Sequence, residues 1–419
     1  MKLPFLLFAD KKGKIYSHPY LKMTAQAMDR VNLPESSELM LAPAGSSFFY
    51  FPGRFPIGYN PKTKTLEVLS KFKGKAVFAV AAFSIPAILR LYNPSYALNE
   101  NKVFPLWAYT ACGFYGNKYY ITAKRIDKRV RQSPRFYDSK LILKNIRATL
   151  SQFPKNRLYQ HLSNCALNYN CLAAKNLFLS RWEAPLPTAK ACNARCSGCL
   201  SDQASDCLSS HGRIKFTPSA KEIFEVAYNH LKVGKEAIVS FGQGCEGEPL
   251  LASDTIAKSI YLLREKTDRG TININTNASL PKKVKLLCLA GMDSFRVSLN
   301  SPVEKNYNLY FRPQGYKFKD VLASIAMAKK HNKFVSLNLF VFPGFTDSET
   351  ELKALIKFIK NNGIDMIQWR NLNIDPQHYL NQYAGFGLEP QGMLLVLETV
   401  RKKFPKLEFG YFNLPKEDF

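Results

Sequence analysis

The chain has 419 residues, of which 46% are hydrophobic and 22% charged, and its net charge is +27. This length is greater than that of one ordinary domain, and the composition is that of a soluble globular protein. The longest apolar run, from Ala76 to Leu89, is interrupted by Ser84 and Pro86 and is too short to span a bilayer. With nine cysteines, an odd number, and no convincing signal-peptide cleavage region, a secreted disulfide scaffold is disfavoured, and we expect a cytoplasmic protein without a membrane contact.

Most of the positive charge lies in the first part of the chain. Residues 1–180 contain 27 Lys and Arg against 8 Asp and Glu, which gives +19 of the total. The densest stretch runs from Lys124 to Arg131 and continues to Arg147, with aromatic residues on both sides. Because basic surfaces attract phosphates and aromatic rings stack on bases, this stretch predicts an RNA contact. A solvated helix face that carries no ligand is the alternative.

Residues 1–175 show no regular alternation of strands and helices. Apolar and aromatic runs such as Ser47–Phe51 are broken by Pro and Gly, which is typical of strands joined by turns, whereas Lys140 to Leu150 has a helical pattern. We therefore predict a strand-rich, mixed α+β N-terminal domain over residues 1–175, with a role in substrate binding as one possibility.

From about residue 181, short apolar runs alternate with amphipathic segments. The expected strands are Glu183–Ala189, Glu236–Phe241, Thr271–Thr276, Asp293–Leu299, Phe334–Phe342 and Ile364–Trp369. The expected helices between them are Ala220–Lys232, Asp254–Lys266, Pro281–Ala290, Lys319–Lys330 and Ser348–Lys360. Such alternation predicts a parallel sheet of the α/β class, as a partial (β/α)6 barrel or an open doubly wound sheet, over residues 181–375. Residues 376–419 are expected to add a C-terminal helix and strand.

Three cysteines follow the first of these strands within eight positions. Cys192, Cys196 and Cys199 stand on one short loop at the carboxyl end of the strand, where α/β proteins bind ligands. Thiolates suit zinc or an iron–sulfur cluster. A structural zinc site usually has four ligands in two separated pairs, and this loop offers only three. Three thiolates on a four-iron cluster would leave one iron free to bind a small molecule.

The spacing Cys-x-x-x-Cys-x-x-Cys after the first strand of a six-unit barrel resembles the radical S-adenosylmethionine (SAM) superfamily. The resemblance implies a 4Fe–4S cluster held by Cys192, Cys196 and Cys199. It also implies that SAM is cleaved reductively to methionine and a 5′-deoxyadenosyl radical, with an electron donor such as flavodoxin or ferredoxin as partner. The position before the third cysteine is usually aromatic in this family, and here it is Gly198.

Later segments resemble the family in the expected order. The run Gly247, Glu248, Pro249 after the second strand is similar to the segment that binds the methionine amino group. By the same resemblance, Thr276 and Ser298 at the ends of the third and fourth strands would contact the cofactor, as would Asn300, where an aspartate is common. Together these segments extend the resemblance over about residues 181–375.

The remaining cysteines have no assigned role in this resemblance. Cys245 lies just before the Gly-Glu-Pro segment, and we consider it a candidate catalytic hydrogen donor, against the alternative of a small residue that fills a turn. Cys165 and Cys171, with a further cysteine, could bind a second cluster or could simply be buried packing residues.

The sequence thus predicts a radical SAM enzyme, an oxidoreductase or a transferase. Its substrate is expected to be polar or anionic: RNA, a peptide or a metabolite. The cluster Trp369 to Tyr379, with Arg370, Asn371 and Asp375, is a candidate substrate contact or a cap on the barrel, and His378 is the best-placed histidine for acid–base chemistry. The alternative is a protein that binds a cluster and SAM for regulation or nucleic-acid binding without turnover.

Overall fold

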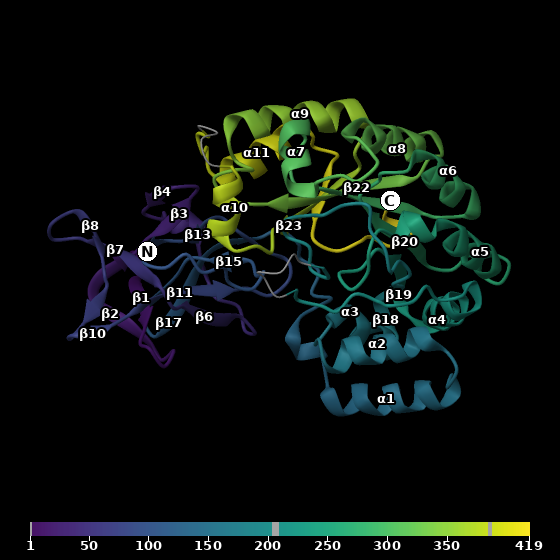
Figure 1. Ribbon diagram of the computed structural model, residues 1–419, viewed down its shortest axis with the longest axis horizontal. Coiled ribbons are helices and arrows are strands. Elements are labelled where there is room, and N and C mark those ends of the chain that lie inside the picture. The colour runs from purple at the N-terminus through teal and green to yellow at the C-terminus, as the bar shows by residue number, and fades with distance from the viewer. Residues whose placement is uncertain (1, 203–208, 384–387) are drawn as a thin grey trace.

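The computed structural model describes residues 2–202, 209–383 and 388–419. Two regions lie side by side: a strand-rich region at the N-terminus, purple and blue in Figure 1, and a parallel sheet with its helices, teal to yellow. Cys207 lies outside the described residues.

The second region is built on seven parallel strands in chain order. They are β18 (Arg181–Pro185), β19 (Lys235–Phe241), β20 (Thr271–Thr276), β21 (Ser294–Leu299), β22 (Phe334–Val341), β23 (Met366–Asn371) and β24 (Glu408–Gly410). The six predicted strands are confirmed within a few residues at each end. The C-terminal extension adds β24, which pairs in parallel with β23. The sheet curls into a partial barrel of the predicted class, with helices on its outer face (Figure 1).

The helices of this region follow the predicted pattern. Those predicted are observed as α4 (Ala220–Val233), α5 (Ser253–Arg264), α6 (Pro281–Ala290), α8 (Phe318–Lys330) and α9 (Glu349–Asn362). Three more are α7 (Glu304–Phe311), α10 (Pro376–Gln382) and α11 (Met393–Lys403). α4 begins with a capping box in which Ser219 and Glu222 satisfy each other's backbone amides. Alternation of these helices with buried strands brings every strand's carboxyl end to one edge.

The N-terminal region consists of antiparallel strands. Twelve of them form one sheet: β1 (Phe5–Ala9), β2 (Ile15–Met23), β5 (Leu39–Leu41), β6 (Ser47–Phe51), β7 (Arg54–Asn60), β8 (Thr65–Val68), β11 (Phe78–Phe83), β12 (Ile88–Arg90), β14 (Tyr96–Leu98), β15 (Tyr109–Thr110), β16 (Cys112–Tyr115) and β17 (Lys118–Arg125). Two smaller sheets contain β3 (Ala25–Ala27), β4 (Arg30–Asn32) and β13 (Asn93–Pro94), and β9 (Lys71–Phe72) with β10 (Lys75–Ala76). Along β11, Val80 and Ala82 join one hydrophobic core and Ala79 and Ala81 another, because successive side chains point to opposite faces.

Three helices connect the two regions. α1 (Ser139–Gln152), α2 (Arg157–Leu167) and α3 (Leu172–Phe178) follow the last strand of the N-terminal sheet. Their buried side chains, including Ile142 and Leu158, belong to the same hydrophobic core as the parallel sheet. In Figure 1, α1 and α2 lie beneath β18 and α4, and α3 lies beside β18. The strand-rich region therefore ends at Arg125, and the helices within residues 139–178 pack with the barrel.

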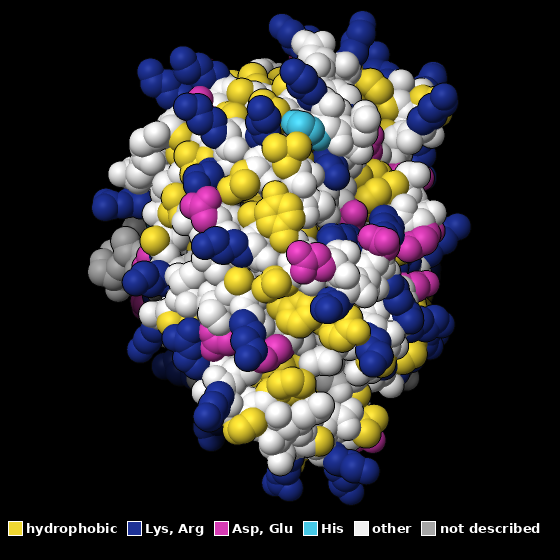
Figure 2. Space-filling model, turned by 90° about the vertical axis from the view of Figure 1, so that its right-hand side faces the viewer, with side chains coloured by type: hydrophobic (Ala, Val, Ile, Leu, Met, Phe, Trp, Pro, Cys, Tyr) yellow, Lys and Arg dark blue, Asp and Glu magenta, His cyan; other side chains and the backbone are white. Residues whose placement is uncertain are grey.

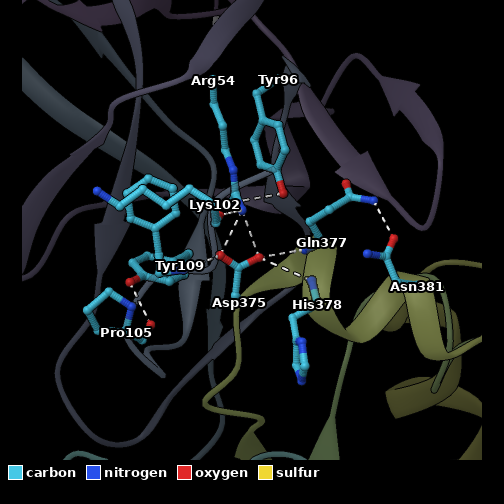
Figure 3. A network of polar contacts seen from close by, with 10 residues as sticks. Arg54, Tyr96, Lys102, Pro105, Tyr109, Asp375, Gln377, His378 and Asn381 are labelled. Carbon is cyan, nitrogen blue, oxygen red and sulfur yellow. Dashed lines mark hydrogen bonds and ion pairs between the residues drawn. The ribbon is translucent and has the colours of Figure 1, made fainter. Parts of the chain in front are cut away.

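A buried ion pair joins the N-terminal sheet to the barrel (Figure 3). Arg54 of β7 donates through Nη2 to both carboxylate oxygens of Asp375, at 2.9 and 2.7 Å. Their side chains are 1% and 0% exposed. Asp375 also accepts hydrogen bonds from the backbone amides of Phe104, Gln377 and His378, so it caps α10 at the same time.

A second contact joins β12 to β23 close by. The Asn371 side chain donates to the carbonyl oxygen of Ile88 at 2.7 Å and accepts from the amide of Arg90 at 2.9 Å. The buried Arg90 guanidinium donates to the carbonyl oxygen of Leu372 at 2.9 Å. Of the residues predicted as a substrate contact or a cap, Asn371 and Asp375 therefore hold the N-terminal sheet against the barrel.

The basic stretch predicted to bind RNA is partly used within the fold. Arg131 is buried, donates to the carbonyl oxygen of Asn413 at 2.6 Å and pairs with Glu236 at 3.1 Å. Arg129 pairs with Asp418 at 3.3 Å. Lys124, Arg125 and Lys128 are exposed. Arg135, Lys140, Lys144 and Arg147, farther along the same stretch, are exposed as well. The RNA prediction therefore depends on these exposed side chains and not on Arg129 and Arg131.

Lys and Arg side chains are also scattered over the end of the molecule far from the N-terminal sheet. Figure 2 shows Lys and Arg spread over the face on the right of Figure 1, with acidic side chains between them.

In the described part of the chain, no helix is both long and apolar enough to cross a membrane.

Removing the Arg54 guanidinium tests how strongly the ion pair joins the two regions. Arg54→Met leaves the Asp375 carboxylate buried without its cation, so we expect the free energy of unfolding to fall by about 3–5 kcal/mol. The control is Arg30→Met, which removes an exposed ion pair. The side chains of Arg30 and Glu389 are 53% and 63% exposed. Loss of this pair is expected to change the free energy of unfolding by about 0–1 kcal/mol. Denaturant unfolding measures both. Equal effects of the two substitutions would contradict a special role for the buried pair.

Candidate functional site

A cavity of about 310 Å³ opens at the carboxyl ends of the parallel strands. This volume is at the lower end of the usual range for small-molecule sites. Predicted site residues that line it are Cys192, Cys196, Cys199, Gly247, Glu248, Pro249, Thr276 and Ser298. The fold thus brings eight of the ten predicted residues to one cavity.

The cysteine loop is held by the end of α7. The amides of Arg195 and Ser197 donate to the carbonyl oxygens of Phe311 and Tyr310, at 3.0 and 2.9 Å. These bonds satisfy carbonyl groups that a helix end leaves free. The loop is therefore fixed by the barrel even though it has no regular secondary structure of its own.

Burial changes the acidity of the loop thiols. Desolvation raises the pKa of Cys192 to about 11, with the nearby Glu248 carboxylate adding to the effect. It raises the pKa of Cys196 well above the ordinary thiol value. Because a metal ligand must be a thiolate, a positively charged metal centre is what would stabilise the ionised form here.

The glycine at position 198 has a steric reason. A Cβ at this position would lie 2.9 Å from the Tyr310 hydroxyl and 3.2 Å from the carbonyl oxygen of Asn373. There is no room for the aromatic residue that the superfamily usually has there. Tyr310 and Phe311 line the same cavity and supply aromatic surface from α7 instead.

Glu246 joins the ends of two strands, and the sequence did not single it out. One carboxylate oxygen accepts from the amides of Thr188 and Ala189, at 2.8 and 2.9 Å, and from the Thr188 hydroxyl at 3.2 Å. The other oxygen accepts from the amides of Gly242 and Gln243, at 2.6 and 2.8 Å. Only the short spacing from Glu248 in the sequence could have drawn attention to this residue.

Glu248 makes a similar connection to the third strand. Its carboxylate accepts from the amides of Leu250 and Asn277, at 3.0 and 2.8 Å, and from the Thr276 hydroxyl at 2.5 Å. Burial raises the pKa of Glu248 to about 7, although these hydrogen bonds act in the opposite direction. The carboxyl group lies at the cavity wall and can accept a cationic ligand group.

Two of the predicted residues do not reach the cavity. The Asn300 side chain donates to the carbonyl oxygen of Asn306 and to the Tyr383 hydroxyl, at 3.3 and 3.2 Å, so it braces the loop after β21. Cys245 is 4% exposed and forms a side-chain hydrogen bond with Cys165. Its thiol therefore does not face the cavity as a hydrogen donor would have to.

Three arginines line the cavity and were not among the predicted site residues. Arg213 approaches Cys199 Sγ at 3.7 Å and pairs with Asp202 at 2.9 Å. Arg296 donates to Gln368 Oε1 at 2.9 Å, and burial lowers its pKa to about 10. Arg370, mentioned only as part of a polar cluster, donates to the carbonyl oxygen of Tyr411 at 2.8 Å. An arginine within a strand pattern gives no sign of its direction, which is why Arg296 was missed.

His378, considered for acid–base chemistry, is not at the cavity wall. Its Nε2 lies 3.2 Å from Gln382 Nε2, and Gln382 accepts a hydrogen bond from Ser197 of the cysteine loop at 2.8 Å. Burial lowers the pKa of His378, so the neutral ring is favoured. The histidine is linked to the cysteine loop through Gln382 and does not line the cavity.

Comparison with known families identifies the barrel. Residues 186–356 match the model of the radical SAM superfamily. The barrel is a radical SAM domain. The match covers the barrel and agrees with the predicted resemblance to this superfamily, whose members are enzymes that use a 4Fe–4S cluster and SAM. It leaves the reaction unspecified. A comparison with curated proteins finds no match.

Solved structures that are similar to part of this chain are distant in sequence. The maturase HydG from Carboxydothermus hydrogenoformans is 13% identical, with a TM-score of 0.39 over 64% of this chain and 68% of that one. Streptococcus suis SuiB bound to its precursor peptide SuiA is 15% identical, with a TM-score of 0.40 over 60% of this chain and 52% of that one. A radical SAM methyltransferase from Sphaerobacter thermophilus is 15% identical, with a TM-score of 0.37 over 46% and 57%.

Two glycines of one loop offer a matched test of the site's geometry. A Cβ on Gly247 would lie 1.9 Å from the carbonyl oxygen of Ala191, beside the cysteine loop, so the loops must separate. We expect Gly247→Ala to lower the free energy of unfolding by about 1–3 kcal/mol. Gly244→Ala, whose Cβ would lie 3.5 Å from Leu200, should change it by less than about 0.5 kcal/mol. Similar unfolding curves for both variants would show that the loops are not in close contact.

Proposed function

We propose that the cavity binds a 4Fe–4S cluster through Cys192, Cys196 and Cys199 and that SAM binds beside it. The observation that carries this proposal is that the three thiols and the strand-end residues Glu248 and Ser298 line one cavity. A protein that only bound a cluster would have no need for these strand-end residues. The geometry therefore favours SAM binding beside the cluster over cluster binding alone, and formation of 5′-deoxyadenosine distinguishes turnover from a regulatory role.

The donor set fits a cluster with one open iron. The three thiols come from one loop, and the described residues that line the cavity include no fourth cysteine and no histidine. A structural zinc ion would require a fourth ligand. A four-iron cluster with three protein ligands leaves one iron for the amino and carboxylate groups of a cofactor.

The reduced cluster, when bound, supplies the electron that cleaves the sulfonium bond of SAM to give methionine and a 5′-deoxyadenosyl radical. The protein's own residues bind and orient. Glu248 presents a buried carboxylate to an ammonium group, and Thr276 and Asn277 fix its orientation. Tyr310, Phe311 and Phe340 add apolar surface that excludes water from the cavity.

The substrate of this site carries an anionic group. Arg296 of β21 and Arg370 of β23 both line the cavity. Burial lowers the pKa of Arg296, and Arg370 lowers it further because the two cations repel each other. An anion bound between them would relieve that repulsion. The guanidinium groups suit a carboxylate or a phosphate, which small metabolites, peptides and RNA all carry.

The proposed reaction requires an electron donor and a substrate as partners. An electron donor such as flavodoxin or ferredoxin would reduce the cluster. An RNA substrate would use the exposed Lys124, Arg125 and Lys128, which lie at and just beyond the end of β17. A peptide or metabolite would need no such surface.

Two sets of substitutions should separate cluster binding from SAM binding. Cys192→Ala, Cys196→Ala and Cys199→Ala should each abolish the iron and sulfide of anaerobically reconstituted protein, about four of each per chain. Ser298→Ala and Glu248→Gln should retain the iron but bind SAM at least about tenfold more weakly in equilibrium dialysis, since each removes a cofactor contact.

Cys288→Ala is the control, because Cys288 is a buried thiol of α6 that does not line the cavity. Stoichiometric zinc without iron in the parent protein would contradict the proposed cluster. Unchanged SAM affinity in both Ser298→Ala and Glu248→Gln would contradict the proposed cofactor contacts.

A further inference from the structure

A second group of metal-ligating side chains lies outside the cavity. His161 and Cys165 are one turn apart on α2, and Cys245 is in the loop that follows β19. Their ligand atoms all lie within 4.8 Å of one another. Residues four apart on a helix share one face, so the helix offers two ligands and the barrel a third.

The spacing of these atoms suits a single ion. His161 Nε2 lies 3.5 Å from Cys165 Sγ. Two ligands with a Zn–N bond of about 2.0–2.1 Å and a Zn–S bond of about 2.3 Å, at the tetrahedral angle, would be about 3.6 Å apart. A cluster of several irons would hold its ligand atoms farther apart and usually takes four thiolates.

We propose that His161, Cys165 and Cys245 bind a zinc ion. Two thiolates and an imidazole are a donor set typical of zinc. Cys165 and Cys245 are both buried, and both are free cysteines. Among the described residues, the hydrogen bonds found for these two thiols and the half-buried histidine side chain join them to one another. Such bonds between neutral groups gain little stability, whereas an ion would bind all three.

The surroundings offer a fourth ligand and so a closed coordination shell. The Nδ1 atom of His211 is buried without a hydrogen-bond partner among the described residues. It lies 3.9 Å from where a Cβ on Gly244 would be, next to Cys245. His211 or a water molecule would supply the fourth ligand.

The zinc site would fix a loop of the cofactor cavity. Cys245 immediately precedes Glu246, which holds the ends of β18 and β19 together. The carbonyl oxygen of Cys245 accepts a hydrogen bond from the amide of Ile214 at 2.8 Å. A metal bond from Cys245 to α2 would keep this loop in position. The site is independent of the proposed cluster, because none of its three ligands lines the cavity.

The test uses full-length protein in which the cluster cannot form. Cys192, Cys196 and Cys199 are all replaced by Ala, so that iron at the proposed cluster does not interfere. We expect this background, purified anaerobically, to contain about one zinc per chain by mass spectrometry of metals. Replacing the zinc with Co²⁺ should give the absorption of tetrahedral cobalt with thiolate-to-metal charge transfer.

Adding Cys165→Ser or His161→Gln should remove most of the zinc and the cobalt absorption, whereas Cys288→Ser, a buried thiol of α6, should remove neither. Circular dichroism of each variant establishes that it is folded. Three outcomes would overturn the proposal: a folded background protein without zinc that fails to bind Co²⁺, zinc content that survives both ligand substitutions, or iron with sulfide in place of zinc. A disulfide between Cys165 and Cys245 in the anaerobic protein would also overturn it. Each of these outcomes leaves the proposed function at the cavity untouched.

Discussion

Two buried carboxylates hold the ends of three strands together, and the cavity depends on them. Glu246 binds the segments that follow β18 and β19, and Glu248 binds the end of β20. Both are bonded mainly to backbone amides, so they fix the chain itself rather than the neighbouring side chains. The backbone amides of Gly247 and Glu248 add direct bonds to the carbonyl oxygens of Ala189 and Ala191, so the Gly-Glu-Pro segment is held beside the cysteine loop as well.

The N-terminal region is attached close to the same edge of the barrel. Arg54 and Arg90 reach from the antiparallel sheet to the segment that follows β23. Arg54 donates to the Asp375 carboxylate there, and Arg90 donates to the carbonyl oxygen of Leu372. Asn371 bonds to β12 and also lines the cavity. The sheet therefore supports the rim of the site through this segment. Any movement of the N-terminal region on binding a partner would reach the cavity by the same connection.

The parallel sheet could be predicted from the sequence because its strands are short buried runs separated by helical patterns. The cysteine loop was predictable because its ligand spacing is local. The strand-end contacts needed a family resemblance, and that resemblance could not reveal that Asn300 turns toward Tyr383 or that Cys245 turns toward Cys165. Side-chain direction at a loop depends on packing between segments distant in the chain, which no local pattern records.

Contacts between distant segments also explain why the arrangement of the N-terminal region could not be predicted. A strand-rich region was expected, but the antiparallel pairing of its strands follows long-range contacts, and the helices of residues 139–178 pack with the barrel for the same reason. Arg129 and Arg131 were interpreted as part of a basic surface, whereas their ion pairs to Asp418 and Glu236 join segments far apart in sequence. Charge counted along a chain does not show which charges are already paired.

If this cavity cleaves SAM, the reconstituted protein must form 5′-deoxyadenosine. The reconstituted protein is mixed anaerobically with SAM and dithionite, and the products are measured by liquid chromatography and mass spectrometry. We expect 5′-deoxyadenosine and methionine in equal amounts from the parent protein and neither from Cys196→Ala. A parent protein that contains its cluster and binds SAM, yet forms no 5′-deoxyadenosine under these conditions, would contradict cleavage of SAM in this cavity.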